Sequence, residues 1–118
     1  MRPKFALLIA ITVAFAALPA AAHHSLSAEY DLNRTIMLKG TVTKVAWANP
    51  HARLYIDVQD AASGVMSWEF VLASPNMLML NGWKIDTLRR GDHVLVYAHP
   101  ARHTENVGYA NRVTTASR

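Results

Sequence analysis

The sequence contains no cysteine, and this absence removes several classes of site at once. Disulfide bonds, thiol chemistry, cysteine-based zinc sites and an acylated lipoprotein anchor are all excluded. The usual catalytic signatures are missing too: there is no nucleophile–base–acid trio, no glycine-rich phosphate loop and no helix that carries two histidines in metal-binding spacing. The sequence therefore favours a binding protein, and an enzyme of unknown type is only the third hypothesis.

The longest apolar run is too short for a membrane span, and it has the pattern of a secretory signal. Arg2 and Lys4 form a basic head, residues 5–18 are apolar apart from one threonine, and residues 19–22 are small or proline. A spanning helix needs about 20 apolar residues. We therefore expect a signal peptide over residues 1–22, a periplasmic or secreted protein, and no membrane span once the signal is removed.

Charged residues make up only 17% of the chain, and the formal net charge is +4. Two of the basic residues belong to the expected signal, and the others are scattered rather than gathered in a patch. We therefore expect no nucleic-acid partner. No repeat, low-complexity segment or linker divides the rest of the chain. The sequence predicts an arm over residues 23–34, followed by one domain over residues 35–118.

Alternation of apolar and polar residues predicts five strands in this domain. The first strand covers residues 35–47, and it needs one extra residue near Thr43-Lys44, a β-bulge, to bring Val45 and Trp47 onto the inner face with Val42. The later strands are expected at residues 53–58, 66–72, 93–98 and 109–114. Residues 60–64 read as the hairpin loop between the second and third strands.

A short helix is predicted between the third and fourth strands. Ser74 is a good N-cap, Pro75 fits the first helical position, and Gly82 suits a left-handed stop. The order of three strands, a helix and two strands is that of the OB-fold. We therefore predict an all-β fold, an OB-fold-like five-stranded β-barrel with one short helix, in which Trp68 and Trp83 belong to the core.

Several short motifs resemble a family of small exported bacterial proteins known only as a domain of unknown function. The paired histidines after the signal and a Trp-x-Asn-Pro-His turn are its most specific parts. The resemblance covers nearly all of the mature chain, and it implies a periplasmic β-barrel without an established activity. The motifs are His23-His24-Ser25, Leu38-Lys39-Gly40, Trp47-Ala48-Asn49-Pro50-His51, Ser74-Pro75-Asn76, Gly82-Trp83 and Gly91-Asp92.

Three histidines predict a metal site. Cleavage after Ala22 makes His23 the first residue, which then offers an α-amine and an imidazole together. Nitrogen ligands in a planar arrangement suit Cu(II), and His51 would complete a histidine-brace-like set, with His24 as its substitute. A cut one residue earlier places His24 third from the amine, which is another Cu(II)-binding pattern. The first hypothesis is therefore a protein that binds copper, and no other cofactor, through His23, His24 and His51.

A metal-free function is the alternative. Histidines after a signal peptide are often solvated, and His51 after Asn49 and Pro50 can instead be a turn residue bonded to the backbone. OB barrels bind ligands on aromatic platforms. The alternative is a periplasmic module that binds a small ligand or an unidentified protein through the outward-facing Tyr55 with Asn49 and Arg53.

Overall fold

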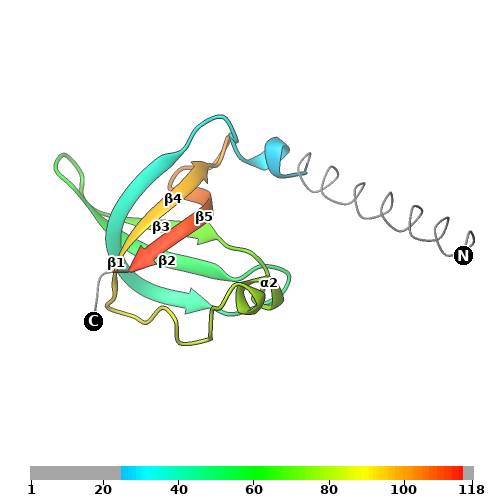
Figure 1. The fold of residues 1–118 in the computed structure, drawn as a ribbon. Coiled ribbons are helices and arrows are strands. Elements are labelled where there is room, and N and C mark those ends of the chain that lie inside the picture. Colours follow the sequence, from blue (N-terminus) through cyan, green and yellow to red (C-terminus); the bar gives the residue numbers. More distant parts are fainter. Residues whose placement is uncertain (1–24, 116–118) are drawn as a thin grey trace, which may run out of the picture.

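The computed structural model describes residues 25–115, which form a closed five-stranded barrel with the strand order β1-β2-β3-β5-β4 (Figure 1). The strands are β1 (Ile36–Ala46), β2 (Arg53–Asp60), β3 (Gly64–Val71), β4 (His93–Pro100) and β5 (Val107–Thr115). Helix α2 (Pro75–Leu80) comes between β3 and β4. The predicted OB-fold-like barrel with one short helix is confirmed.

The expected signal peptide over residues 1–22 lies outside the described residues, as do His23 and His24. The described chain begins with a helical turn at residues 25–29 and reaches the barrel through the rest of the arm. Within residues 25–115, no helix has the length and hydropathy that a membrane span requires.

Strand β1 is long and bent because it pairs with β4 along its first half and with β2 along its second. The predicted bulge is present: Val42 pairs with Ile56, whereas Lys44 pairs with Tyr55, so that Thr43 is the extra residue. The Thr43 hydroxyl donates to the Tyr55 carbonyl at 3.2 Å. One strand can therefore serve both sides of the barrel.

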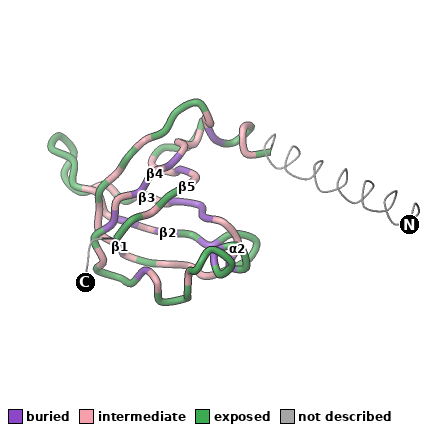
Figure 2. The backbone as a smooth tube through the Cα atoms, in the orientation of Figure 1, coloured by how far each residue is buried: buried purple, intermediate pink, exposed green. Residues whose placement is uncertain are grey.

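The core lies where the inner faces of the strands meet, which Figure 2 shows as buried stretches along the strands. Leu54 and Ile56 of β2, Phe70 of β3 and Val96 of β4 are fully buried. In β2 and β4 the buried residues alternate with less buried ones, as expected for strands with one wet face. Trp83 is partly buried and packs against this core from the segment after α2.

Helix α2 begins as its sequence predicts. The Ser74 hydroxyl accepts a hydrogen bond from the Met77 N–H at 3.2 Å, and Pro75 occupies the first turn. The helix ends at Asn81, and Gly82 follows with a φ of 90°, a left-handed conformation that glycine adopts without strain. Leu78 anchors the helix to the barrel because it is the buried residue of its apolar body.

Strands β3 and β5 close the barrel by a short parallel contact of three residue pairs, from Glu69–Val107 to Val71–Tyr109. The loop of residues 101–106 enters β5 beside this contact. On the other side of β2, residues 47–52 connect β1 to β2 and carry His51, with a cis peptide bond between Asn49 and Pro50. These two loops frame the candidate sites.

Candidate functional site

His51 is held in one orientation by the backbone of the segment after β3. Its Nδ1 lies 2.9 Å from the carbonyl oxygen of Leu72. A carbonyl only accepts, so Nδ1 carries the proton and Nε2 keeps its lone pair. Metal-binding histidines commonly fix their second ring nitrogen on a carbonyl in this way, and so do turn histidines. The hydrogen bond to Leu72 is therefore consistent with His51 as a metal ligand and equally with His51 as a turn residue.

The N-terminal arm is attached to the barrel beside His51. Tyr30 is 7% exposed and forms an isolated bridge with Ala101, and the Arg102 N–H donates to the Glu29 carbonyl at 2.9 Å. The Tyr30 ring lies 5.7 Å from the ring of Tyr109 in β5. Burial, followed by the negative charge of Glu29, raises the pKa of the Tyr30 hydroxyl. This tyrosine is therefore a neutral anchor for the arm.

The arm and the His51 loop enclose one pocket of about 220 Å³. Tyr109 forms its wall, with its ring edge-on to the His51 imidazole at a centroid distance of 6.5 Å. The pocket brings together the start of the described chain and the loop between β1 and β2. Its lining consists of Ser25, Leu26, Glu29, Tyr30, His51, Arg53, Val71 and Tyr109.

His23 and His24 come directly before Ser25, and only His51 of the three predicted metal ligands lies within the described residues. Consecutive Cα atoms are about 3.8 Å apart. His24 is therefore one residue from a residue that lines the His51 pocket. Within residues 25–115, no group of three histidine, aspartate or glutamate side chains could hold a metal ion. A metal site at His51 would therefore need ligands from outside the described residues, and His23 and His24 are the predicted ones.

Of the three residues predicted for ligand binding, Arg53 and Tyr55 are connected through Glu69, whereas Asn49 lies apart. Arg53 pairs with Glu69 at 3.0 Å, and the Tyr55 hydroxyl donates to the same Oε1 at 3.1 Å. Desolvation, followed by this hydrogen bond, raises the pKa of Tyr55. Lys44 lies 5.5 Å from the centre of the Tyr55 ring. Asn49 is exposed in the loop before β2 and does not join this cluster.

Comparison with known protein families identifies the family of this chain. The model of a family of unknown function matches residues 10–110. The chain belongs to DUF6152. No curated protein matches it.

Among solved structures, the DUF6152 chain is similar to Rim1, a mitochondrial single-stranded DNA binding protein of S. cerevisiae. One crystal form gives a TM-score of 0.53 at 11% identity and covers 70% of this chain and 92% of Rim1. A second form gives 0.52 at 14% identity, with 70% and 91% covered. At such identities, the likeness shows the OB-fold alone.

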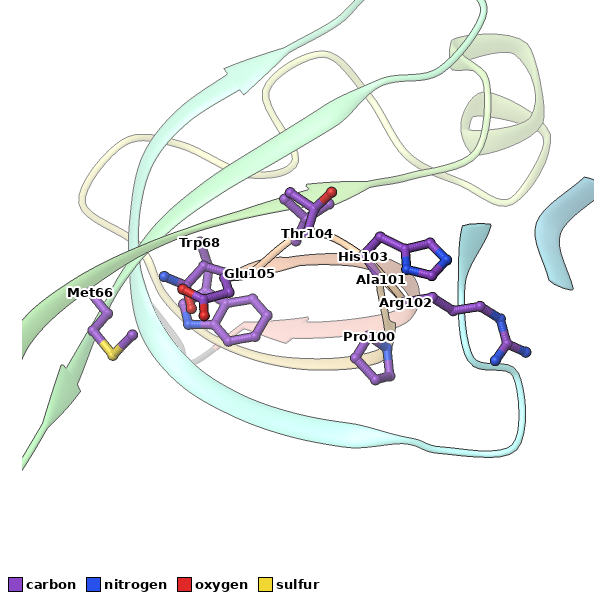
Figure 3. Close-up of a pocket in the computed structure, with 10 residues that line it drawn as sticks. Met66, Trp68, Pro100, Ala101, Arg102, His103, Thr104 and Glu105 are labelled. Atoms are coloured by element: carbon purple, nitrogen blue, oxygen red, sulfur yellow. The ribbon is translucent and has the colours of Figure 1, made fainter. Parts of the chain in front are cut away.

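The DUF6152 barrel also carries two adjoining grooves on its β3 side. A groove of about 450 Å³ lies above Tyr55, and one of about 570 Å³ lies between β3 and the loop of residues 101–106 (Figure 3). Trp68 lines both, with one face stacked on Phe70 at 5.7 Å and 11°. Trp68 therefore packs against the core, as predicted, and its partly exposed surface also lines the two grooves.

The other histidines of the described chain do not gather with His51. His99 uses both ring nitrogens: Nδ1–H donates to the Arg34 carbonyl at 2.7 Å, and Asn111 Nδ2 lies 3.3 Å from Nε2. His93 contacts the Thr41 hydroxyl through Nδ1 at 3.3 Å. His103 lies against the arm in a different pocket, which Glu29 and Tyr30 also line, and His51 is the histidine that shares a pocket with Ser25.

Proposed function

We propose that this DUF6152 protein is an exported periplasmic barrel that binds a metal ion, with copper preferred, through His23, His24 and His51. The observation that carries the proposal is the shared pocket. Ser25, the first described residue, lines it together with His51. The arm is therefore attached to the barrel at the place where the terminal nitrogens and the His51 ring would have to meet.

The donor set favours copper on chemical grounds. His51 contributes Nε2, because Nδ1–H is committed to the Leu72 carbonyl. A mature chain that begins at His23 adds an amine and an imidazole. Three nitrogen ligands suit Cu(II), which also heads the divalent affinity order. Glu29 adds negative charge to the pocket, and the positive charge of Arg53 is offset by Glu69.

The test is a Cu(II) titration of the processed protein, with mass spectrometry to identify its first residue. We expect one-to-one binding that His51→Ala weakens at least about tenfold, the usual scale for a lost ligand interaction of about 1.4 kcal/mol. His51→Asn is the informative companion, because its amide can still donate to the Leu72 carbonyl while the ligand nitrogen is gone. It should bind copper as weakly as His51→Ala.

His93→Ala is the matched control, since His93 is exposed on β4 and lines neither of the pockets that the arm forms. Its removal should leave the affinity unchanged. If His51→Ala and His51→Asn bind copper as tightly as the parent protein, the arm and the loop do not form one site, and the metal function is wrong.

The groove above Tyr55 supports a second candidate, a metal-free ligand- or protein-binding module. Tyr55 and Trp68 provide aromatic surface there, and Lys44 and Glu69 provide charge of both signs. Arg53 holds Glu69 in place at its edge. This candidate takes precedence if copper binding proves indifferent to His51. Tyr55→Ala should then abolish capture of the ligand.

A further inference from the structure

Strand β3 is fully paired along one edge and largely unpaired along the other. It pairs with β2 over its whole length, from Arg53–Val71 to Asp60–Gly64. Its contact with β5 begins only at Glu69. Residues 64–68 therefore have a strand partner on one side alone, among the residues that the structure describes.

The backbone groups that face this free edge can be identified by parity. The Glu69 N–H donates to the Asn106 carbonyl at 3.0 Å, so Glu69 directs its peptide groups toward the β5 side. Residues two and four positions earlier direct theirs the same way, because both groups of one residue point to one edge and alternate along a strand. Val65 and Ser67 thus present N–H and C=O groups to the free edge.

The space beside this edge is open. The groove of about 570 Å³ lies between Met66 and Trp68 on one side and residues 100–107 on the other (Figure 3). The loop of residues 101–106 forms the opposite wall of this groove. An added strand therefore has both a hydrogen-bonding edge and room beside it.

The strand itself lacks the charges and prolines that usually protect a free edge, while Glu105 of the neighbouring loop lines the groove beside it. Residues 61–68 include no charged residue and no proline, and Val65 is 56% exposed. Charges, prolines and bulges are the common means by which proteins prevent such edges from pairing. An uncharged edge is suited to a second copy of itself, since a twofold axis places the same residues on both sides without like charges in opposition.

We propose that two copies of this chain join antiparallel along β3, with the twofold axis at Met66. The free groups determine the register. Val65 of one copy opposes Ser67 of the partner subunit, and each such pair exchanges two hydrogen bonds. A register centred on Ser67 would need the groups of Glu69, which β5 already uses.

The proposed register also fits the side chains. Trp68 opposes Gly64 of the partner subunit, so the largest side chain of the segment faces the residue that has none. The β2–β3 hairpin extends away from the rest of the barrel in Figure 1. Metal binding at His51 plays no part in this association.

The first test measures self-association of the processed protein by analytical ultracentrifugation, from micromolar to millimolar concentration. Val65→Pro removes an edge N–H that the single chain does not use for pairing. Val65→Thr keeps both the N–H and the branched shape. We expect a dimer for the parent and for Val65→Thr, and a dissociation constant raised about tenfold or more by Val65→Pro, which removes two hydrogen bonds per dimer.

Thermal unfolding of both variants identifies any general loss of structure. A parent protein that stays monomeric throughout the range would overturn the proposal. A Val65→Pro variant that folds and dimerises as well as Val65→Thr would do the same.

The second test reads the register directly. Residues opposed in a non-hydrogen-bonded antiparallel pair have Cα atoms about 4.5 Å apart, within the range of a disulfide. Since the chain has no cysteine, Met66→Cys introduces the only thiol and should give a covalent dimer on mild oxidation. Met37→Cys is the control, because Met37 is 60% exposed but lies on β1. Equal rates of cross-linking for the two variants would contradict the register.

Discussion

At the scale of single residues, Gly40 shows how closely β1 and β2 approach. A Cβ at this position would lie 2.5 Å from the backbone oxygen of Asp57 and 3.0 Å from Cδ1 of Ile56. Backbone cannot move aside as a flexible side chain can. The absence of a side chain at Gly40 is therefore a packing requirement of the bent strand.

Gly40→Ala should destabilise the protein by about 1–3 kcal/mol, the usual cost of forcing extra atoms into a packed site. The measurement is urea unfolding followed by tryptophan fluorescence. Lys39→Ala, an exposed neighbour on the same strand, should stay within about 0.5 kcal/mol of the parent. A stable Gly40→Ala variant would mean that β1 and β2 can separate at this point without cost.

His51 illustrates a different property of a single residue. One backbone hydrogen bond determines which ring nitrogen carries the proton and which keeps its lone pair. The same contact also ties the loop of residues 47–52 to the segment after β3. Any substitution at His51 changes both functions unless the replacement can still donate to Leu72, which is why His51→Asn is needed beside His51→Ala.

At the scale of secondary-structure elements, α2 is a short helix that depends on its N-cap and on one buried side chain. It has six residues, and Leu78 and Pro75 are its buried members. A helix of this length is not stable by itself in water. The Ser74 hydroxyl satisfies one of the free N–H groups at its start.

Ser74→Ala should lower the free energy of unfolding by about 1 kcal/mol, because the Met77 N–H loses its acceptor. Ser74→Asp retains an acceptor and should recover most of the loss. Chemical denaturation compares the three proteins. A loss shared equally by both variants would indicate that the Ser74 hydroxyl does not act as a cap.

At the scale of the whole molecule, the arm connects the start of the described chain to the barrel, and Tyr30 is its main contact. The ring is buried against Tyr109, and the neighbouring backbone pairs with residues 100–102. A tethered segment acts at a high effective concentration, which is lost when the tether is released. If the proposed metal site exists, the arm contributes to it by holding the N-terminal histidines close to His51.

Tyr30→Ala should weaken Cu(II) binding in the processed protein at least about tenfold, although the variant retains His23, His24 and His51. The loss of a buried aromatic side chain, typically about 3–5 kcal/mol, is enough to detach the arm. Isothermal titration measures the affinity, and hydrogen exchange at residues 25–34 reports detachment.

Tyr97→Ala is the matched control, since Tyr97 lies on β4 beneath the Arg112 side chain and away from the arm. It should leave copper binding unchanged. If Tyr30→Ala detaches the arm yet binds copper as the parent does, the terminal histidines form a site that does not need His51.

The elements of the barrel could be predicted from the sequence because their signals are local. Alternation of apolar residues marked the strands, and a break in that alternation located the bulge at Thr43. Turn and cap chemistry at Ser74 and Gly82 marked the ends of α2. The observed strands β2 and β4 each extend two residues beyond the predicted ends at Val58 and Ala98, since pairing with a neighbour prolongs a strand past its own pattern.

The candidate site was predictable only in part, and the reason is distance along the chain. The sequence identified His51 and its two possible roles, but the pocket that joins it to Ser25 and Tyr109 depends on how β5 packs beside the arm. The pairing of Arg53 and Tyr55 through Glu69 follows from the β2–β3 register. Asn49, which is adjacent in sequence, is left outside that cluster.

The sequence by itself determined which segments become strands and helix, because alternation, caps and turn residues act over a few positions. Tertiary structure alone decided that Trp68 is only partly buried and that the first part of β3 has a free edge. Both depend on where β5 begins to pair with β3, at Glu69 and Val107. That contact joins residues far apart in the chain and is set by closure of the barrel.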